Sequence, residues 1–233
     1  MKSLTFPLFL AGMMLCGASF FPVSAATSLE KADDPLSKMK VGRLGIGMEG
    51  KALSFDQPET LIEKHLPQAD FISKIWKDEK GRPTHQRDLL FVKSGYYWVV
   101  IDYLYGTAQH AVARSYHFPT GLAVVSFPWS QYQLADGRNF RIQPLDTDGV
   151  ITLPAPVTTV ITSWSGENAP KIEPMKAVNP MVVKLKVSFP NGRVDDLAFA
   201  WESRPLHLDG KELEGWAACV RHDRQKMEFF EVN

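Results

Sequence analysis

The sequence has few cysteines and no excess of charge of either sign. Cys16 and Cys219 are the two cysteines among 233 residues, so the chain can form neither a disulfide framework nor a zinc site built on cysteines. Lys and Arg together number 26, as do Asp and Glu, and the formal net charge is zero. Because phosphate contacts require a local excess of Lys and Arg, this balance excludes a generally basic nucleic-acid-binding protein.

Hydrophobic runs long enough to span a membrane are also lacking. The longest apolar run covers residues 6–21, about 16 residues against the roughly 20 that a spanning helix needs. Lys2 precedes this run, and the small residues Val23-Ser24-Ala25-Ala26 follow it. This order predicts a secretory signal peptide over residues 1–26, and therefore a periplasmic or secreted mature chain without a membrane span. The alternative is a membrane anchor.

The remaining composition excludes a disordered chain and favours many short elements. Apolar residues make up 45% and aromatic residues 11%, enough for a packed core, and Gly and Pro at 16 each indicate many turns. Residues 27–57 are polar and then rich in glycine, so we interpret them as a leader, with one domain over residues 58–233. Cys219 lies among apolar residues that favour its burial in a strand.

The domain is expected to consist mainly of β-strands. Period-two alternation and continuous apolar runs, bounded by turn residues, recur from Arg87 onward. Asn191-Gly192 follows the strictly alternating run 181–189 and is typical of a two-residue hairpin, and Lys93-Ser94-Gly95 joins another strand pair. About a dozen strands at this spacing predict an all-β fold, an antiparallel β-sandwich or barrel. Strands are expected near residues 52–55, 71–77, 88–93, 96–103, 111–118, 122–127, 140–142, 149–152, 157–164, 181–189, 194–201, 213–220 and 227–232.

One segment has helical rather than strand spacing. Pro58-Glu59-Thr60 is followed by apolar residues at Leu61, Ile62 and Leu66, and Pro67 would end a helix there. The spacing predicts one short N-terminal helix over residues 58–66.

Residues 84–119 resemble a known family. His85-Gln86-Arg87, an apolar strand ending in Phe91-Val92-Lys93, a turn, and then Tyr97-Trp98-Val99-Val100-Ile101-Asp102 follow in order. This order is similar to the opening of the C-terminal β-domain of the heparinase II/III-like polysaccharide lyases. The resemblance continues through Arg114 to His117-Phe118-Pro119, where the family has a strand ending in His-Phe or His-Leu, and a fainter likeness covers residues 163–170. It spans roughly residues 71–232 and implies a β-sandwich.

The resemblance also implies what this chain lacks. In the family, catalysis belongs mostly to a large helical toroid that precedes the β-domain and supplies an amide, a base, an acid and Arg contacts to a uronate. A His-x-His metal motif also lies upstream there. Between residues 27 and 82 this chain has one histidine, His65, and no room for a toroid. We therefore expect a free-standing module, or a degenerate or split lyase, with no catalytic residues, metal site or cofactor of its own.

The residues that suit an acidic polysaccharide are cationic and aromatic. His85 and Arg87 share a strand face and could contact a carboxylate or sulfate, whereas the alternative is that the pair holds Asp102. A zinc site from His85, Asp102 and His117 is chemically possible, but no ligand spacing supports it. The predicted polysaccharide-binding residues are His85, Arg87, Arg114, His117, Trp129 and Trp164.

Aromatic residues divide between core and surface in this prediction. Tyr96, Tyr97 and Trp98 are consecutive, so they must point to both faces of the sheet, and Trp98 is expected in the core. Trp129, Tyr132 and Trp164 lie beside expected loops, where an aromatic ring can stack on a sugar. The alternative is that these rings cover the edge of the sandwich.

Three hypotheses for function follow. The first is an exported, non-catalytic sandwich that binds an acidic, uronate-containing polysaccharide or docks on a separately encoded catalytic chain. The second is a polysaccharide lyase acting by β-elimination, and the third is a structural or interaction protein of the cell envelope.

The signal-peptide hypothesis predicts that the mature chain begins at Ala26 or Thr27. Signal peptidase cleaves after small residues such as those at 23–26, so the exported protein should lack residues preceding the cut. Intact-mass measurement of the exported protein checks this, and a mature form that retains Met1 contradicts it.

Overall fold

The computed structural model consists of β-strands in all its described parts. Every regular element there is a strand and every strand pairing is antiparallel. The all-β, antiparallel prediction is therefore confirmed for these ranges, and they contain no helix that could cross a membrane. The predicted signal peptide and most of the leader lie outside them. The structure describes residues 44–48, 51–52, 58–116, 123–126, 130–133, 137–146, 149–200, 206–208, 211–213 and 216–231.

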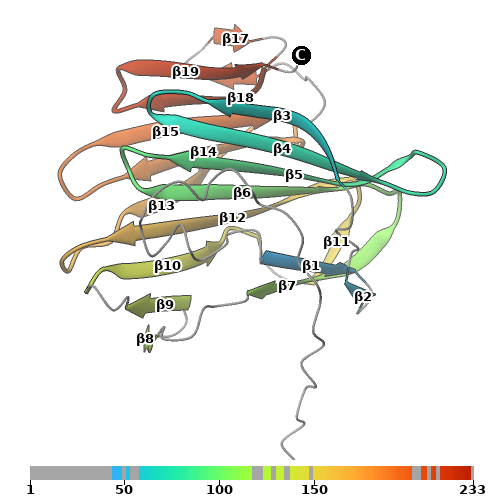
Figure 1. Cartoon of the computed structure of the whole chain (residues 1–233), viewed down its shortest axis with the longest axis horizontal. Helices are drawn as coiled ribbons and strands as arrows, with labels where there is room; N and C mark the ends of the chain where they lie inside the picture. Colours follow the sequence, from blue (N-terminus) through green and yellow to red (C-terminus); the bar gives the residue numbers. More distant parts are fainter. Residues whose placement is uncertain are drawn as a thin grey trace, which may run out of the picture.

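Two large sheets form most of the described fold (Figure 1). The larger has eight strands in the order β3 (Glu59–His65), β4 (Ala69–Lys77), β5 (Pro83–Val92), β6 (Tyr97–Leu104), β12 (Ala155–Trp164), β10 (Asn139–Pro144), β9 (Ser130–Gln133) and β8 (Ala123–Ser126). The smaller has five strands in the order β13 (Lys171–Met175), β14 (Val182–Ser188), β15 (Val194–Ala200), β18 (Trp216–His222) and β19 (Lys226–Glu231).

Two further sheets complete the described strands. One is four-stranded, in the order β11 (Gly149–Thr152), β7 (Gln109–Tyr116), β1 (Leu44–Met48) and β2 (Lys51–Ala52). The other is the hairpin of β16 (Leu206–Leu208) and β17 (Lys211–Leu213). Val112 of β7 packs with Leu104 and Val157 of the larger sheet, so the four-stranded sheet lies against one end of it.

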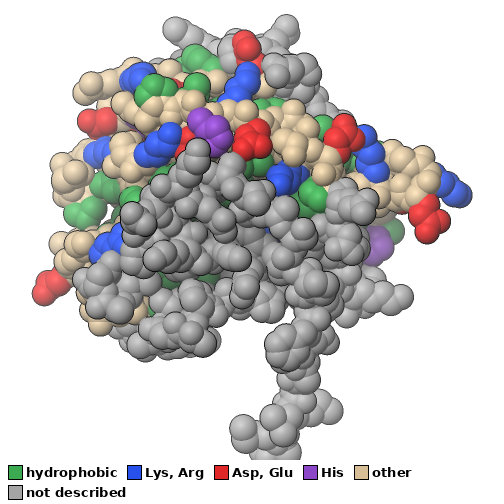
Figure 2. All heavy atoms as spheres, in the orientation of Figure 1, with side chains coloured by type: hydrophobic (Ala, Val, Ile, Leu, Met, Phe, Trp, Pro, Cys, Tyr) green, Lys and Arg blue, Asp and Glu red, His purple; other side chains and the backbone are tan. Residues whose placement is uncertain are grey.

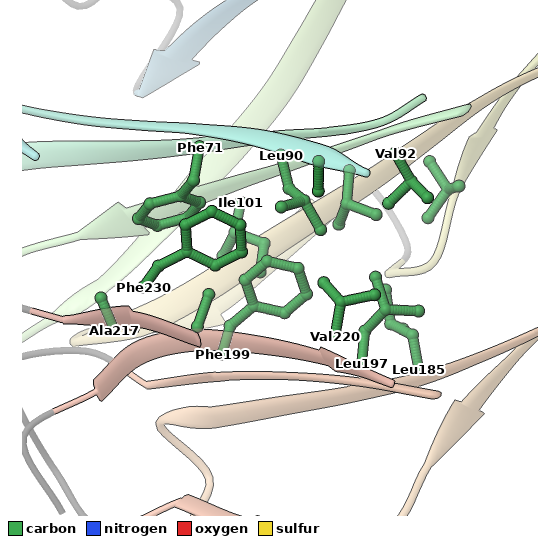
Figure 3. Close-up of a cluster of buried hydrophobic side chains, with 14 of the residues drawn as sticks. Phe71, Leu90, Val92, Ile101, Leu185, Leu197, Phe199, Ala217, Val220 and Phe230 are labelled. Carbon is green, nitrogen blue, oxygen red and sulfur yellow. The ribbon is translucent and has the colours of Figure 1, made fainter. Parts of the chain in front are cut away.

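The two large sheets pack face to face around one apolar core, which makes the fold a β-sandwich. Figure 3 shows their side chains meeting between the sheets. Phe71 of β4 and Phe230 of β19 approach each other with ring centroids 5.1 Å apart. Alternate residues of each strand supply this core, as the period-two pattern predicts. The labelled members are Phe71, Leu90, Val92 and Ile101 of the larger sheet, and Leu185, Leu197, Phe199, Ala217, Val220 and Phe230 of the smaller.

Strand β6 lies in the middle of the larger sheet and is buried at every position. Tyr97, Val99 and Ile101 face the sandwich core. Trp98 and Val100 face the opposite way and pack in a second apolar cluster with Leu89, Phe140, Ile142 and Ile161. We call this side of the larger sheet its outer face. Trp98 is buried, as expected, but in this second cluster and not between the two sheets.

A buried carboxylate connects the two sheets at one end of the sandwich. The hydroxyl of Tyr97 on β6 donates a hydrogen bond of 3.0 Å to Asp195 Oδ2 on β15. Arg193 binds the same carboxylate through Nε at 3.0 Å and a terminal nitrogen at 2.7 Å, and the backbone N–H of Asp223 donates to it at 2.9 Å. Asp195 is therefore fully buried without an unmet charge, which is the condition for tolerating a carboxylate there.

The predicted helix over residues 58–66 is wrong. Residues 59–65 form strand β3, which pairs antiparallel with β4 at the edge of the larger sheet. A bulge between Thr60 and Ile62 shifts the register, so that Ile62 is buried in the core while the neighbouring Leu61 is 37% exposed. The bulge breaks the period-two pattern and imitates helical spacing. Pairing with β4 overrides the weak local preference for a helix.

The other expected elements correspond closely to observed ones. Each expected strand overlaps an observed strand, although residues 53–55 of the strand expected at 52–55 lie outside the described residues. Both predicted hairpin turns, at 93–95 and 191–192, join neighbouring antiparallel strands. The described residues nevertheless contain 19 strands and not about a dozen. The unexpected ones, β1, β3, β9, β13, β16 and β17, have at most seven residues each and show too few alternations to be recognised.

Charged side chains protect the exposed edge of the larger sheet. Edge strand β3 carries Glu59, which pairs with Lys77, and Lys64, whose Nζ lies 3.9 Å from Glu231 of the smaller sheet. His65 Nδ1 lies 3.0 Å from Asp70. Figure 2 shows basic and acidic side chains interspersed over this β3–β4 region. Such charges discourage pairing with the edge of another chain.

Asp88, a second buried carboxyl group, lies on the core side of β5. Among the described residues, no cation is bound to it. Asp88 Oδ1 accepts hydrogen bonds from Ser73 Oγ at 2.6 Å and from Gln86 Nε2 at 3.0 Å. Burial raises the pKa of Asp88 to about 7, although the two hydrogen bonds oppose this shift. Near neutral pH the group is therefore partly protonated.

We expect the free energy of unfolding to fall as pH rises from about 4 to about 7, through Asp88. The folded state holds this proton up to pH about 7, whereas the ordinary pKa in the unfolded chain is 3.8. Between these values the folded state binds more protons, so a rise in pH favours unfolding by at most about 1.4 kcal/mol per pH unit. The Asp88→Asn variant should lose this slope. Urea unfolding of both proteins, followed by circular dichroism at several pH values, measures it; equal slopes would contradict the assignment.

Candidate functional site

His85 and Arg87 both bind one carboxylate on the neighbouring strand. They lie two residues apart at the start of β5, so they share the outer face, and Arg87 lies directly opposite Asp102 of β6. Asp102 Oδ1 lies 2.6 Å from both His85 Nε2 and Arg87 Nε. A terminal nitrogen of Arg87 donates to Asp102 Oδ2 at 3.1 Å, which makes the Arg–carboxylate contact bidentate.

Burial sets the protonation states of this group. Burial alone would raise the pKa of Asp102, but Arg87 and His85 outweigh it and hold that pKa below its ordinary value. Burial lowers the pKa of His85, with Asp102 opposing this effect. The group therefore contains a carboxylate, a guanidinium and a neutral imidazole that donates Nε2–H to Asp102.

The environment of His85 leaves its side chain almost inaccessible from the surface. The side chain is 1% exposed, and its ring stacks on that of Trp76 at 4.7 Å between centroids and 19° between planes. The Arg87 side chain is 12% exposed. The structure therefore agrees with the alternative stated for this pair, in which His85 and Arg87 hold Asp102 within the sheet.

Trp164 lies at the other end of the larger sheet. It is the last residue of β12 and pairs with Asn139, whereas the end of β12 near His85 begins at Ala155, opposite Leu104. The structure therefore separates the predicted residues His85 and Trp164 by most of the length of this strand. We call the end of the larger sheet where β12 stops and β6 begins the Trp164 end.

A guanidinium covers the indole of Trp164. The central carbon of the Arg141 guanidinium lies 5.1 Å from the centroid of the Trp164 ring, and a terminal nitrogen of Arg141 donates to Gln131 Oε1 at 3.0 Å. Both side chains are half-buried. Burial lowers the pKa of Arg141 from its ordinary value, yet a guanidinium remains charged near neutral pH. The pair thus combines an apolar ring with a partly desolvated positive charge.

Arg141 is a residue that sequence reasoning missed. It lies between Phe140 and Ile142, which point to the outer face, so it must point to the same side as Thr162 and Trp164. The alternation of a charged residue between two apolar ones was the available signal. It could not reveal the contact, because that contact depends on the pairing of β10 with β12.

The remaining predicted residues are not brought together by the described structure. Arg114 lies on β7 opposite Ile46, but its side chain, His117 and Trp129 lie outside the described residues. Among the side chains that the structure does describe, no three of His, Cys, Asp and Glu are grouped so as to hold a metal ion. Cys219 is buried in β18, as expected, and burial raises the pKa of its thiol to about 12.

Comparisons with known proteins give a likeness in fold. No protein-family model and no curated protein matches the chain. The crystal structure of a mutant of heparan sulfate lyase HepC from Pedobacter heparinus matches with a TM-score of 0.52 and 15% identity, over 68% of this chain and 30% of that chain. A second crystal structure of HepC from Pedobacter heparinus matches with a TM-score of 0.47 and 15% identity, over 61% and 28% of the two chains.

The fold expected from the family resemblance is therefore confirmed. This chain shares the fold of one part of a heparan sulfate lyase, and the matched part covers 30% of that protein's chain. At 15% identity the likeness concerns the fold and assigns no role to any residue.

We expect Arg87→Met to destabilise the fold by about 3 kcal/mol or more, because it leaves the buried Asp102 with His85 alone. The matched control is Arg82→Met, which removes an Arg from a pair with Asp78 in the β4–β5 turn, where the Arg82 side chain is 72% exposed. The control should change the free energy of unfolding far less, because water screens and replaces that contact. Urea unfolding of the three proteins compares them. Equal losses in both variants would show that Asp102 does not depend on Arg87.

Proposed function

We propose that this chain is an exported, non-catalytic β-sandwich that binds an acidic, uronate-containing polysaccharide at the Trp164 end. The observation that carries the proposal is the Arg141 guanidinium held 5.1 Å from the centre of the Trp164 ring, with both side chains half-buried. The proposal is supported further by the fold, which is that of part of a protein named as a heparan sulfate lyase.

The chemistry of the pair suits a sugar that carries a negative charge. The part of the half-buried indole that remains accessible beside Arg141 offers an apolar surface to the C–H groups of a pyranose ring. The guanidinium offers planar N–H donors that match a carboxylate or a sulfate. Because Arg141 is partly removed from water, its attraction to an anion is stronger than that of a fully exposed arginine.

The absence of turnover is part of the proposal, and the positions of the described groups support it. Eliminating a sugar at the carbon beside a uronate carboxylate needs a base, an acid and a group that holds the enolate charge. Of the two predicted site histidines, the structure describes the side chain of His85. It is buried and donates its Nε2–H to Asp102. Trp164 and Arg141 provide neither a base nor an acid near neutral pH.

We expect the purified protein to bind a soluble uronate polymer without forming an unsaturated product. Trp164→Ala should weaken binding about tenfold, as is typical of an aromatic anchor, and Arg141→Gln should weaken it to a similar extent. Trp164→Phe keeps a ring and should retain most of the affinity. Calorimetric titration measures binding, and ultraviolet absorbance of the product measures cleavage.

The control is Arg82→Gln, which removes one positive charge at the opposite end of the larger sheet and should leave binding unchanged. If Arg82→Gln and Arg141→Gln weaken binding equally, the polymer responds to overall charge and the site is wrong. Absence of binding by the unmodified protein would reject the proposal. Growth of product absorbance would favour the lyase alternative. If the Trp164 and Arg141 variants bind as tightly as the unmodified protein, the contact lies elsewhere.

A further inference from the structure

Tyr96 has a backbone conformation that is uncommon for a tyrosine. Its φ is 50°, in the left-handed region that favours glycine and asparagine. The preceding Gly95 has no room for a side chain, since a Cβ there would lie 2.6 Å from a ring carbon of Tyr97 and 2.7 Å from one of Phe189. The turn therefore packs tightly on the sandwich, and a tyrosine follows it at a position where its backbone is strained.

The same turn is fixed by contacts with other parts of the sandwich. The backbone N–H of Lys93 donates to the carbonyl of Gln68 at 2.8 Å, and its ammonium group lies 2.7 Å from Asp70 Oδ1. Arg193 donates to Ser94 Oγ at 2.7 Å. These contacts hold the turn, so the direction of the Tyr96 side chain is set before any ligand binds.

The ring of Tyr96 lies over an aromatic pair on the outer face. Phe91 and Trp98 stack with centroids 4.7 Å apart and planes at 16°. Tyr96 meets them edge to face, at 5.5 Å from Phe91 and 5.2 Å from Trp98. The central guanidinium carbon of Arg138 lies 5.4 Å from the centre of the Tyr96 ring, and Tyr96, Phe91 and Arg138 are half-buried.

This arrangement repeats, on the other face of the sheet, the chemistry of Arg141 and Trp164. The backbone N–H of Ser163 donates to the carbonyl of Tyr96 at 3.4 Å, so the turn at Tyr96 lies beside the last residues of β12 at the Trp164 end. Trp164 lies on the same side of β12 as Val160, which belongs to the sandwich core. Tyr96 packs with Trp98 on the opposite, outer face.

We propose that Tyr96 and Arg138 form a second subsite for an acidic polysaccharide, so that one chain passes around the Trp164 end and contacts both faces of the sheet. The inference rests on the proposed function, because it assigns a second contact to the same ligand. The accessible part of the half-buried phenol ring contacts the C–H groups of a sugar residue, and the Arg138 guanidinium contacts a carboxylate or sulfate on that residue or the next. Two contacts on one chain raise its affinity through a high effective concentration at the second contact.

The test compares Tyr96→Asn with Tyr96→Phe. Asparagine accepts the left-handed backbone, so Tyr96→Asn removes the ring without adding strain to the turn. Phenylalanine keeps the ring and loses only the hydroxyl. With a long uronate polymer as the probe, Tyr96→Asn should weaken binding about tenfold or more, whereas Tyr96→Phe should retain it. Arg138→Gln should weaken binding as well, with Arg82→Gln again as the charge control.

A second probe, a uronate disaccharide, separates avidity from damage to the fold. The disaccharide is too short to contact both faces, so its binding to the Trp164 subsite should be equal in Tyr96→Asn and in the unmodified protein. If Tyr96→Asn weakens both probes equally, the ring has only a structural role and the inference is overturned. A third outcome is that the polymer binds, that Trp164→Ala weakens this binding and that Tyr96→Asn does not. The second subsite is then wrong, while the proposed function stands. If the unmodified protein binds no polymer, both are rejected.

Discussion

Strand β6 is buried along its whole length, on both faces, and this constraint organises the described sandwich. One face packs against the smaller sheet and the other against the second apolar cluster. A strand in this position can carry a polar group only if a neighbouring strand supplies its partner, because no water can replace it. Asp102 and Tyr97 are such groups, and each has its partner on an adjacent strand or on the opposing sheet.

Three buried aspartates show that the groups bound to a buried carboxyl group determine its role in the fold. Asp102 binds Arg87 and His85, and its pKa stays below the ordinary value despite burial. Asp195 binds Arg193 and the hydroxyl of Tyr97, and so connects the sheets. Asp88 receives a hydroxyl and an amide in place of a cation, and burial raises its pKa to about 7. Neutral donors do not offset the loss of hydration of a carboxylate, whereas a bidentate guanidinium does.

How far the sequence predicts this fold depends on where each strand lies. The central strands β5, β6, β12, β14 and β15 were predicted because burial imposes long apolar or alternating runs on them. Edge strand β3 was mistaken for a helix, because one side is free of pairing and a bulge disturbs its alternation. Local pattern carries little information about such strands, and pairing with a neighbour determines them.

The sequence predicts only part of the candidate site, because pairing between distant strands determines the other contacts. The shared face of His85 and Arg87 and the alternative role of holding Asp102 follow from parity within one hairpin. Arg141 and Arg138 were missed, because their partners Trp164 and Tyr96 belong to strands or turns distant in the sequence. Parity places a side chain on a face, but the neighbour it meets depends on which strands lie side by side.

The positively charged side chains at the two ends of the larger sheet have different partners. At the His85 end the guanidinium of Arg87 is taken up by a buried carboxylate, and little of either group reaches the surface. At the Trp164 end, Arg141 and Arg138 lie over aromatic rings and remain half-buried. Arg87 is neutralised by a bidentate carboxylate, whereas Arg141 is bound to a neutral amide, that of Gln131, and both Arg141 and Arg138 add a positive charge beside an aromatic ring. This contrast supports the proposal that an anionic sugar binds at the Trp164 end, although the residues of the recognisable sequence motif lie at the other end.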